Sequence, residues 1–376
     1  MRTTIITTLL LITSLHIKAQ DAEALYNEGV QLKDAKKSAE ALVKFRKAVE
    51  LKPGYTAALY EMGWCQNDTK DYTGALSSLR KARLGWYTIP KVHFELGFAF
   101  EKTNLTDSAI QSYNRCLFYK PDYALAFKQL GTIAYNKDDY ENGLANFTKY
   151  EAASKIPITD YLYWYRKGYM CNAIKDYTAA KVALQRSLEY KTDYTNTYLE
   201  MGFACNKLKQ GDEAIDYFTK AIAIEPNSHI GYNGIAEVYR DTKKDMDMAI
   251  SWYKKSLAVK TDERKACFGM AYCLNTKGNY SDAIPYLQKA IQQEATYTAA
   301  YVELGYSYYM TGRNDDAIKQ CEKALSLNPN NENARYYLGL IYINQKNKTK
   351  AQQMADELKS LNSKNAATLQ DKVNKM

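Results

Sequence analysis

Acidic residues in short turns are the side chains of this 376-residue sequence that could most readily do chemistry. They occur in QGDEAI at 210–215, RNDDAI at 313–318 and KDYTGAL at 70–76, and neighbouring carboxylates can serve acid–base catalysis or bind calcium. Each turn precedes an apolar helical pattern, where Asp caps free backbone N–H groups and complements the helix dipole. We therefore predict that these acids are helix caps, and that the chain has no catalytic residue and no metal site.

The other common catalytic chemistries lack the residues they need. Three histidines are too few for most zinc hydrolase, iron or acid–base sites. The sequence also has no GxSxG, HExxH, P-loop or dinucleotide-binding fingerprint. We expect a protein that is not an enzyme and that needs no cofactor.

Seven cysteines are the remaining reactive side chains. Their number is odd, and their spacing matches neither a disulfide framework nor paired CxxC metal ligands. Because a free thiol behaves as a small apolar group, we predict buried thiols rather than disulfides. The positions are Cys65, Cys116, Cys171, Cys205, Cys267, Cys273 and Cys321.

Charge and composition exclude further classes of protein. The net charge is +9, but only 11 of the 51 basic residues are Arg, the side chain that nucleic-acid readers favour. We expect no nucleic-acid partner. The 46% hydrophobic content, with 18 Gly and 7 Pro, is typical of a folded chain rather than a disordered or polytopic membrane protein.

The first residues have the pattern of an export signal. Arg2 precedes an uncharged apolar stretch from Thr3 to Leu15, and a short polar segment then ends near Ala19. This pattern predicts a secretory signal peptide at residues 1–19, cleaved after Ala19. The alternative is an uncleaved anchor, but the stretch is shorter than the ~20 residues that a spanning helix needs. The mature chain is expected to lack a transmembrane segment and to be exported, to the periplasm or as a secreted protein.

An internal repeat organises the rest of the sequence. Small residues recur mostly at 34-residue steps, with a second small residue twelve positions later and a third seven positions after that. A large apolar residue lies between the second and the third small residue. This spacing predicts two amphipathic helices in each unit, which cross closely at the small residues. The first small residues are Gly29, Gly63, Gly97, Gly131, Gly168, Gly202, Ala236, Ala271, Gly305 and Gly339.

The repeat resembles the tetratricopeptide repeat (TPR) family. Residues 300–331, AYVELGYSYYMTGRNDDAIKQCEKALSLNPNN, carry the small, aromatic and proline positions of that family almost completely. The resemblance implies an all-α fold, a right-handed superhelical solenoid of antiparallel helix pairs with one continuous core. Ten units are expected over residues 22–365, starting near 22, 56, 90, 124, 161, 195, 229, 264, 298 and 332, followed by a capping helix at 366–376.

Three places depart from the regular repeat. Tyr150 occupies a position that is small in other units, and the next unit starts three residues late after 150–160, so we expect irregular packing there. One extra residue in 240–248 predicts a longer turn. Pro285 is expected in the opening turn of its helix, where the missing N–H costs little.

The resemblance implies a concave groove lined by the fifth and ninth residues of each unit. Aromatic residues fill 12 of these 20 positions, which either form a strip that faces a ligand or pack against neighbouring units. The unit with Lys128 and Thr132 does not complete the clamp with which some TPR domains bind acidic peptide termini. The candidate groove residues are Tyr60, Trp64, Phe94, Phe98, Tyr165, Tyr169, Phe203, Phe268, Tyr272 and Tyr306.

The sequence therefore favours a non-catalytic scaffold of the cell envelope. Its groove is expected to bind an extended peptide or a helix of another, unidentified protein. The alternative is a glycan-associated protein of polysaccharide export or cell-wall assembly, in which the same aromatic rings stack on sugars. Aromatic side chains suit both ligands, so their presence alone does not choose between them.

Overall fold

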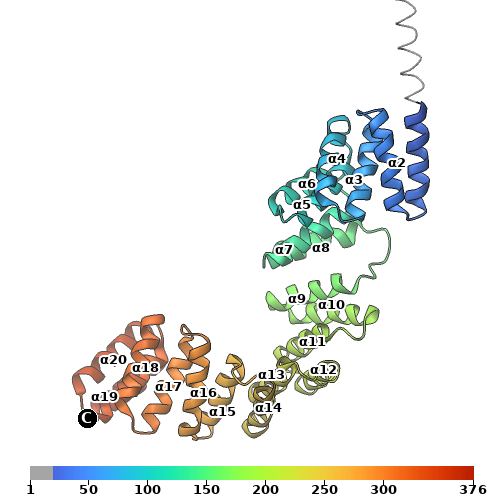
Figure 1. Cartoon of the computed structure of the whole chain (residues 1–376). Coiled ribbons are helices and arrows are strands. Elements are labelled where there is room, and N and C mark those ends of the chain that lie inside the picture. The colour runs from blue at the N-terminus through green and yellow to red at the C-terminus, as the bar shows by residue number, and fades with distance from the viewer. Residues whose placement is uncertain (1–19) are drawn as a thin grey trace, which may run out of the picture. The chain divides into compact units, whose positions relative to one another are not determined.

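Paired helices make up the structure, a computed structural model that describes residues 20–376 (Figure 1). The expected signal peptide at 1–19 lies outside the described residues. The first helices of the pairs are 20–34, α3 (Thr56–Asp68), α5 (Pro90–Lys102), α7 (Ala124–Asn136), α9 (Tyr161–Ala173), α11 (Thr195–Lys207), α13 (His229–Val238), α15 (Arg264–Thr276), α17 (Thr298–Met310) and α19 (Glu332–Asn344).

The second helices of the pairs are α2 (Ser38–Leu51), α4 (Tyr72–Gly85), α6 (Thr106–Tyr119), α8 (Tyr140–Ala153), α10 (Tyr177–Tyr190), α12 (Gly211–Ile224), α14 (Met246–Val259), α16 (Tyr280–Gln293), α18 (Asn314–Leu327) and α20 (Lys348–Ser360). A last helix, α21 (Asn365–Asn374), follows. The described residues contain no strand. The chain is thus an all-α solenoid of consecutive helix pairs, as the repeat predicts.

The small residue of each pair marks a close helix crossing. A Cβ placed on Gly97 would lie 2.7 Å from the ring of Tyr113, sixteen residues later on α6, and a Cβ on Gly29 would lie 2.7 Å from Phe45 on α2. Both large side chains are fully buried. The alternation of a missing side chain and a bulky one therefore sets the distance between the two helices of a pair.

The chain forms two compact units, one that ends at Thr159 and one from Asp160 to Met376. This division differs from the single continuous core that the resemblance implies. It falls in the irregular segment between α8 and α9. The bulky Tyr150 of α8 is buried at a position occupied by Ala48 and Ala82 in earlier pairs. A tyrosine ring does not permit the close crossing that alanine does, so the regular stacking is interrupted here.

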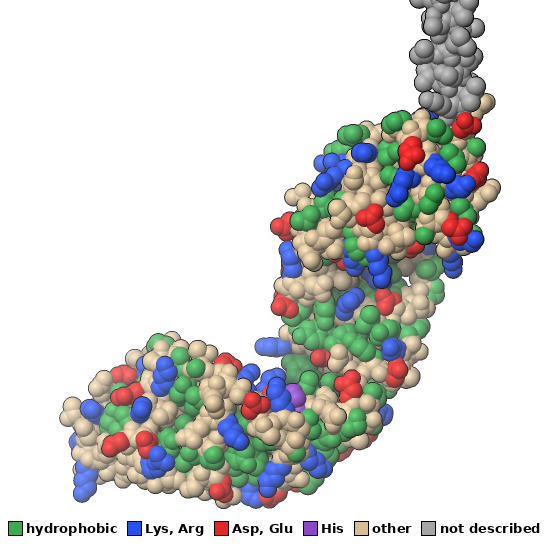
Figure 2. All heavy atoms as spheres, viewed as in Figure 1, with side chains coloured by type: hydrophobic (Ala, Val, Ile, Leu, Met, Phe, Trp, Pro, Cys, Tyr) green, Lys and Arg blue, Asp and Glu red, His purple; other side chains and the backbone are tan. Residues whose placement is uncertain are grey.

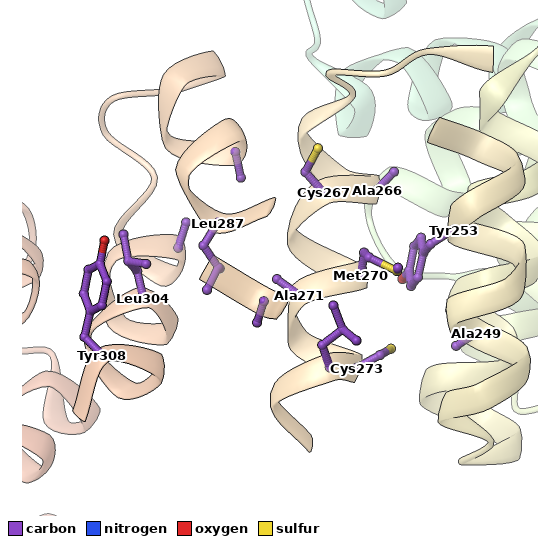
Figure 3. Close-up of a cluster of buried hydrophobic side chains, with 14 of the residues drawn as sticks. Ala249, Tyr253, Ala266, Cys267, Met270, Ala271, Cys273, Leu287, Leu304 and Tyr308 are labelled. Carbon is purple, nitrogen blue, oxygen red and sulfur yellow. The ribbon is translucent and has the colours of Figure 1, made fainter. Parts of the chain in front are cut away.

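Each unit has its own apolar core. In the second unit, fully buried side chains of α14, α15 and α16 form one continuous cluster. Figure 3 shows Tyr253 of α14 pointing toward Met270 of α15, with Leu287, Leu304 and Tyr308 further along the same cluster. Each helix pair thus buries its apolar face only by packing against its neighbours.

The extra residue near 240 lies within a helix rather than in a longer turn. Residues Tyr239–Lys243 continue α13 as a π-helical turn, η1, which absorbs one residue without breaking the helix. The expectation of a longer turn was therefore wrong. The expectation for Pro285 was also wrong, because Pro285 is the sixth residue of α16 and lies beyond the four N–H groups that a helix leaves free.

The C-terminal helix closes the second unit. Leu369 and Val373 of α21 are fully buried, whereas Met376 is 40% exposed. The residue sixteen positions after Gly339 is Ala355, which is too small to fill the space beside this glycine. Leu369 fills it instead and packs against Gly339. The helix therefore acts as a cap for the last pair.

Candidate binding pocket on the first helices

The first unit carries a pocket of about 460 Å³ on the face formed by its first helices. We call it the inner pocket. Residues of α3, α5 and α7 make up most of its wall, and the turn between α3 and α4 and the first residue of α4 add the rest. Its lining residues are Trp64, Asn67, Asp68, Lys70, Tyr72, Phe94, Glu95, Phe98, Leu125, Lys128 and Gln129.

Three of the ten predicted groove residues meet in this pocket. Trp64, Phe94 and Phe98 are half-buried and line it together. Tyr60 does not line it, because its ring is buried and packs 5.8 Å from the ring of Trp86. Half-burial leaves the three lining side chains one surface for packing and one for a ligand.

The other predicted groove residues belong to the second unit and are described there alone. Tyr165 is buried and its ring meets that of Tyr194 at 5.1 Å. Tyr272 is the most open of the set, 40% exposed. Tyr169, Phe203, Phe268 and Tyr306 are half-buried. The structure therefore does not bring all ten candidates into one pocket.

A row of tyrosines contacts the aromatic residues at the ninth position and was missed from the sequence. Tyr72 meets Phe98 with ring centroids 6.2 Å apart and planes at 70°. The same edge-on contact joins Tyr177 to Phe203 and Tyr280 to Tyr306. Each tyrosine is the first residue of a second helix. The recurring signal is an Asp or Asn followed by Tyr, as in DY at 71–72 and 176–177 and NY at 279–280.

Lysine side chains lie over the aromatic rings that the ninth position provides. Lys33 Nζ lies 5.5 Å from the ring centre of Trp64, and Lys102 Nζ lies 5.2 Å from that of Phe98. In the second unit Lys207 Nζ lies 5.2 Å from the ring centre of Phe203. These cation–π contacts cover part of a ring face and place positive charge beside each aromatic side chain.

One nearly buried carboxylate lies in the wall of the inner pocket. Glu95 accepts a hydrogen bond of 2.8 Å from Asn67 Nδ2. Burial raises the pKa of Glu95 to about 7, although the hydrogen bond from Asn67 favours the charged form. Glu95 therefore changes charge near neutral pH, and the charge of the pocket changes with it.

The acidic turns are parts of helix N-termini in the structure. Asp71 accepts a hydrogen bond of 2.9 Å from the Gly74 N–H and caps α4. In α12 and α18 the cap positions are Gln210 and Arg313, and the acids lie within the first turn, where they still complement the helix dipole. Within residues 20–376, no group of His, Cys, Asp or Glu side chains is arranged to hold a metal ion.

The seven cysteines are buried and free, as the repeat register predicts. Burial raises the pKa of Cys65 to about 12 and that of Cys273 to about 11, so these thiols are protonated at neutral pH and poor nucleophiles. Figure 2 shows acidic and basic side chains interspersed on the visible face of both units. None of the helices in the described part of the chain is both long and apolar enough to cross a membrane.

Family models identify the repeats directly. Models described as tetratricopeptide repeat match residues 195–228, 274–322 and 333–364, and a model described as TPR repeat matches 305–346. These matches show that the chain contains tetratricopeptide repeats, and the helix pairs of the structure follow the same register.

Similar proteins come from several contexts. Anaphase-promoting complex subunit 3 of Schizosaccharomyces pombe (strain 972 / ATCC 24843) is 23% identical over 182 residues, which is 48% of this chain and 27% of that protein. The chain thus matches about a quarter of that relative's length. The solved APC/C hetero-tetramer Cut9-Hcn1 covers 99% of this chain and 95% of its own, with a TM-score of 0.51 and 14% identity.

A second solved structure is PilW, a type IV pilus biogenesis factor. It covers 56% of this chain and 97% of its own, with a TM-score of 0.51 and 18% identity. At these identities both structures show a shared fold and nothing more. The fold is that of a family whose repeats bind other proteins.

Proposed function

We propose that this protein is a non-catalytic scaffold of the cell envelope that binds an extended segment of a partner protein in its inner pocket. The convergence of Trp64, Phe94 and Phe98 on one pocket carries the proposal. Half-buried aromatic rings lose little conformational entropy when they bind, and they anchor apolar side chains of a peptide. Asp68, Lys70 and Lys128 at the same pocket add polar groups that can orient the peptide.

The lysines over the rings favour a peptide over a sugar. A sugar ring stacks on an open aromatic face, and Lys33 and Lys102 lie over the faces of Trp64 and Phe98. The edge of Tyr72 contacts the Phe98 ring as well. A peptide side chain needs only an apolar edge of the ring, which these contacts leave uncovered. The glycan-associated role is the alternative outcome of the test below.

Affinity purification with a groove variant tests the binding role. The Trp64→Ala/Phe98→Ala variant and the single Phe98→Ala variant are compared with Tyr190→Ala, which removes a 42% exposed ring from the second helix α10. Circular dichroism first establishes that each variant is folded. Recovery of partner proteins by wild type and Tyr190→Ala, with loss in the groove variants, supports the proposal. Loss of binding to purified envelope polysaccharide with protein partners retained favours the glycan role.

Export is the second part of the proposal. It rests on the charge and hydrophobicity pattern of residues 1–19. N-terminal sequencing of the protein from its native host is expected to find a chain that starts after Ala19. An intact Met1 on cytosolic protein would contradict the envelope location and leave the binding role of the inner pocket untouched.

A further inference from the structure

A second pocket, of about 580 Å³, lies between α4, α5 and α6 of the first unit. We call it the outer pocket. Helix α6 contributes most of its wall, including Ser108, Ser112, Arg115 and Phe118, and Arg83 comes from the last turn of α4.

The outer pocket and the inner pocket lie on different faces of α5. His93 and Phe100 line the outer pocket, and they are seven residues apart, close to two full helical turns. Phe94, Glu95 and Phe98 line the inner pocket from positions turned by roughly 100 to 200° around the same helix. A ligand in one pocket therefore leaves the other free.

Two cations without acidic partners define the chemistry of the outer pocket. Arg83 and Arg115 both line it, no acidic residue does, and neither arginine takes part in an ion pair among the residues that the structure describes. Both charges act on the buried His93, whose pKa is lowered chiefly by burial and further by these two arginines. The pocket therefore carries two positive charges that no described residue pairs with.

Exposed aromatic surface surrounds one of these cations. The guanidinium carbon of Arg115 lies 5.6 Å from the ring centre of Tyr87 and 5.9 Å from that of Phe118. Tyr87 is 49% exposed and Phe118 is 72% exposed. Stacking between rings holds the planar guanidinium in one orientation, and such a group binds a carboxylate through two parallel hydrogen bonds.

A large apolar residue at the position of Phe118 is specific to α4 and α6 among the second helices. Leu84, 34 residues before Phe118, occupies the same position of the preceding pair and is 84% exposed. In the other second helices this position holds Glu50, Ala152, Glu189, Ala223, Ala258, Gln292, Ser326 and Ser360, none of which is a large apolar residue. Two adjacent pairs thus carry large apolar residues where the other pairs have small or polar ones.

A hydrogen bond and ring contacts hold the floor of the pocket in place. His93 is buried and its Nε2 donates a hydrogen bond of 2.5 Å to the Tyr87 carbonyl oxygen. The His93 ring stacks on Tyr119 with centroids 5.5 Å apart, and Tyr119 meets Phe118 at 5.1 Å. A preorganised floor lowers the entropic cost of binding.

We propose that the outer pocket is a second binding site, which takes an acidic peptide segment of a partner protein. A carboxylate of the segment pairs with Arg83 and Arg115, and a neighbouring apolar side chain packs on Tyr87 and Phe118. A recessed pocket with two cations fits a side chain better than a flat anionic membrane, and the exposed rings give a peptide more contact than a free inorganic anion would have.

A titration with matched peptides tests the proposal. The probes are the acetylated, amidated peptide Asp-Phe-Glu-Phe-Asp and its neutral analogue Asn-Phe-Gln-Phe-Asn, and the readout is the ring NMR signal of His93. His229 is the only other histidine in the described residues, so a His229→Gln variant assigns the signal. The acidic peptide is expected to shift the His93 signal with at least tenfold higher affinity than the neutral one, and more weakly as salt rises.

Variants locate the site. Arg83→Gln/Arg115→Gln is expected to weaken the acidic peptide at least tenfold, whereas the exposed Arg186→Gln on α10 and the groove variant Trp64→Ala/Phe98→Ala retain binding. Circular dichroism establishes that the double variant is folded, and the single Arg115→Lys variant provides a milder change. No His93 shift at 1 mM acidic peptide, or an equal response to both peptides, would overturn the proposal. Full displacement by 10 mM inorganic phosphate, or arginine-dependent binding to phosphatidylglycerol vesicles in place of the peptide, would also overturn it.

Discussion

Asn67 Nδ2 on α3 donates a hydrogen bond of 2.8 Å to Glu95 Oε2 on α5 and another of 3.1 Å to the Glu95 carbonyl oxygen. The same pair of contacts recurs 28 residues apart in the second unit, from Asn172 to Glu200 and from Asn275 to Glu303. Each of these contacts joins the last turn of the first helix in one pair to the first helix of the following pair. Neighbouring units are therefore tied by polar bonds as well as by apolar packing.

The raised pKa of Glu95 makes stability depend on pH. The folded-state pKa of about 7 lies above the ordinary value of 4.5, so the folded protein binds more protons between these values. Stability contributed by this group is thus lost as pH rises through that window. Glu95→Gln keeps an oxygen acceptor for Asn67 and removes the charge.

We expect the free energy of unfolding of Glu95→Gln, relative to wild type, to increase between pH 5 and pH 8 by on the order of 1 to 3 kcal/mol. Urea unfolding at both pH values measures the difference. The exposed Glu50→Gln is the matched control and is expected to show no such increase. Parallel pH profiles for wild type and Glu95→Gln would show that this carboxyl does not couple folding to pH.

The close crossing at Gly305 predicts a coupled pair of substitutions. A Cβ on Gly305 would lie 2.6 Å from Cys321 Sγ and 3.3 Å from the Ala317 carbonyl oxygen. Gly305→Ala is therefore expected to cost about 1 to 3 kcal/mol, and Gly305→Leu more. In a Cys321→Ala background the cost of Gly305→Ala is expected to fall, because the sulfur is gone. Strictly additive effects in thermal melts would place Gly305 away from this contact.

Pro285 offers a stabilising substitution. At the sixth position of α16 it removes the hydrogen bond that a residue there would donate to the Ser281 carbonyl oxygen, and its ring crowds that carbonyl. Pro285→Ala is expected to raise stability by about 1 to 3 kcal/mol. Pro121→Ala is the control, because Pro121 lies in the turn between α6 and α7 and strains no helix. An unchanged melting temperature for Pro285→Ala would mean that α16 has already relaxed around the proline.

The capping role of α21 rests on Leu369. Truncating this fully buried side chain leaves a cavity beside Gly339, so Leu369→Ala is expected to cost about 2 to 5 kcal/mol. Amide hydrogen exchange is expected to show reduced protection first in α19 and α20. Met376→Ala changes a 40% exposed side chain of the same segment and serves as control. Equal exchange in both variants would show that the last pair is stable without its cap.

Sequence spacing predicted the helix pairs because one physical constraint repeats in each of them. A small residue such as Gly97 faces a large one such as Tyr113 sixteen positions later, and that pairing leaves a clear trace in the sequence. The departures were harder to interpret. A single inserted residue near 240 fits a longer turn or a π-helical turn equally well, and only the packing of α13 on α14 selects between them.

The candidate site was predicted in part. Residues that share a repeat position share a helix face, which is why Trp64, Phe94 and Phe98 were identified together. Tyr60 occupies an equivalent position but is buried by Trp86, a residue outside the repeat pattern. Tyr72 was missed because it lies on a second helix, and its contact with Phe98 depends on how two pairs stack.

Site-specific photo-crosslinking tests the central claim, that the inner pocket binds a partner protein, most directly. A photoreactive benzoylphenylalanine replaces Phe98 in the inner pocket and, in a separate variant, Tyr190 on α10, and the native cells are irradiated. We expect discrete adducts between this protein and another protein from position 98, and none of these adducts from position 190. The absence of any adduct from position 98, or the same adducts from both positions, would contradict the claim.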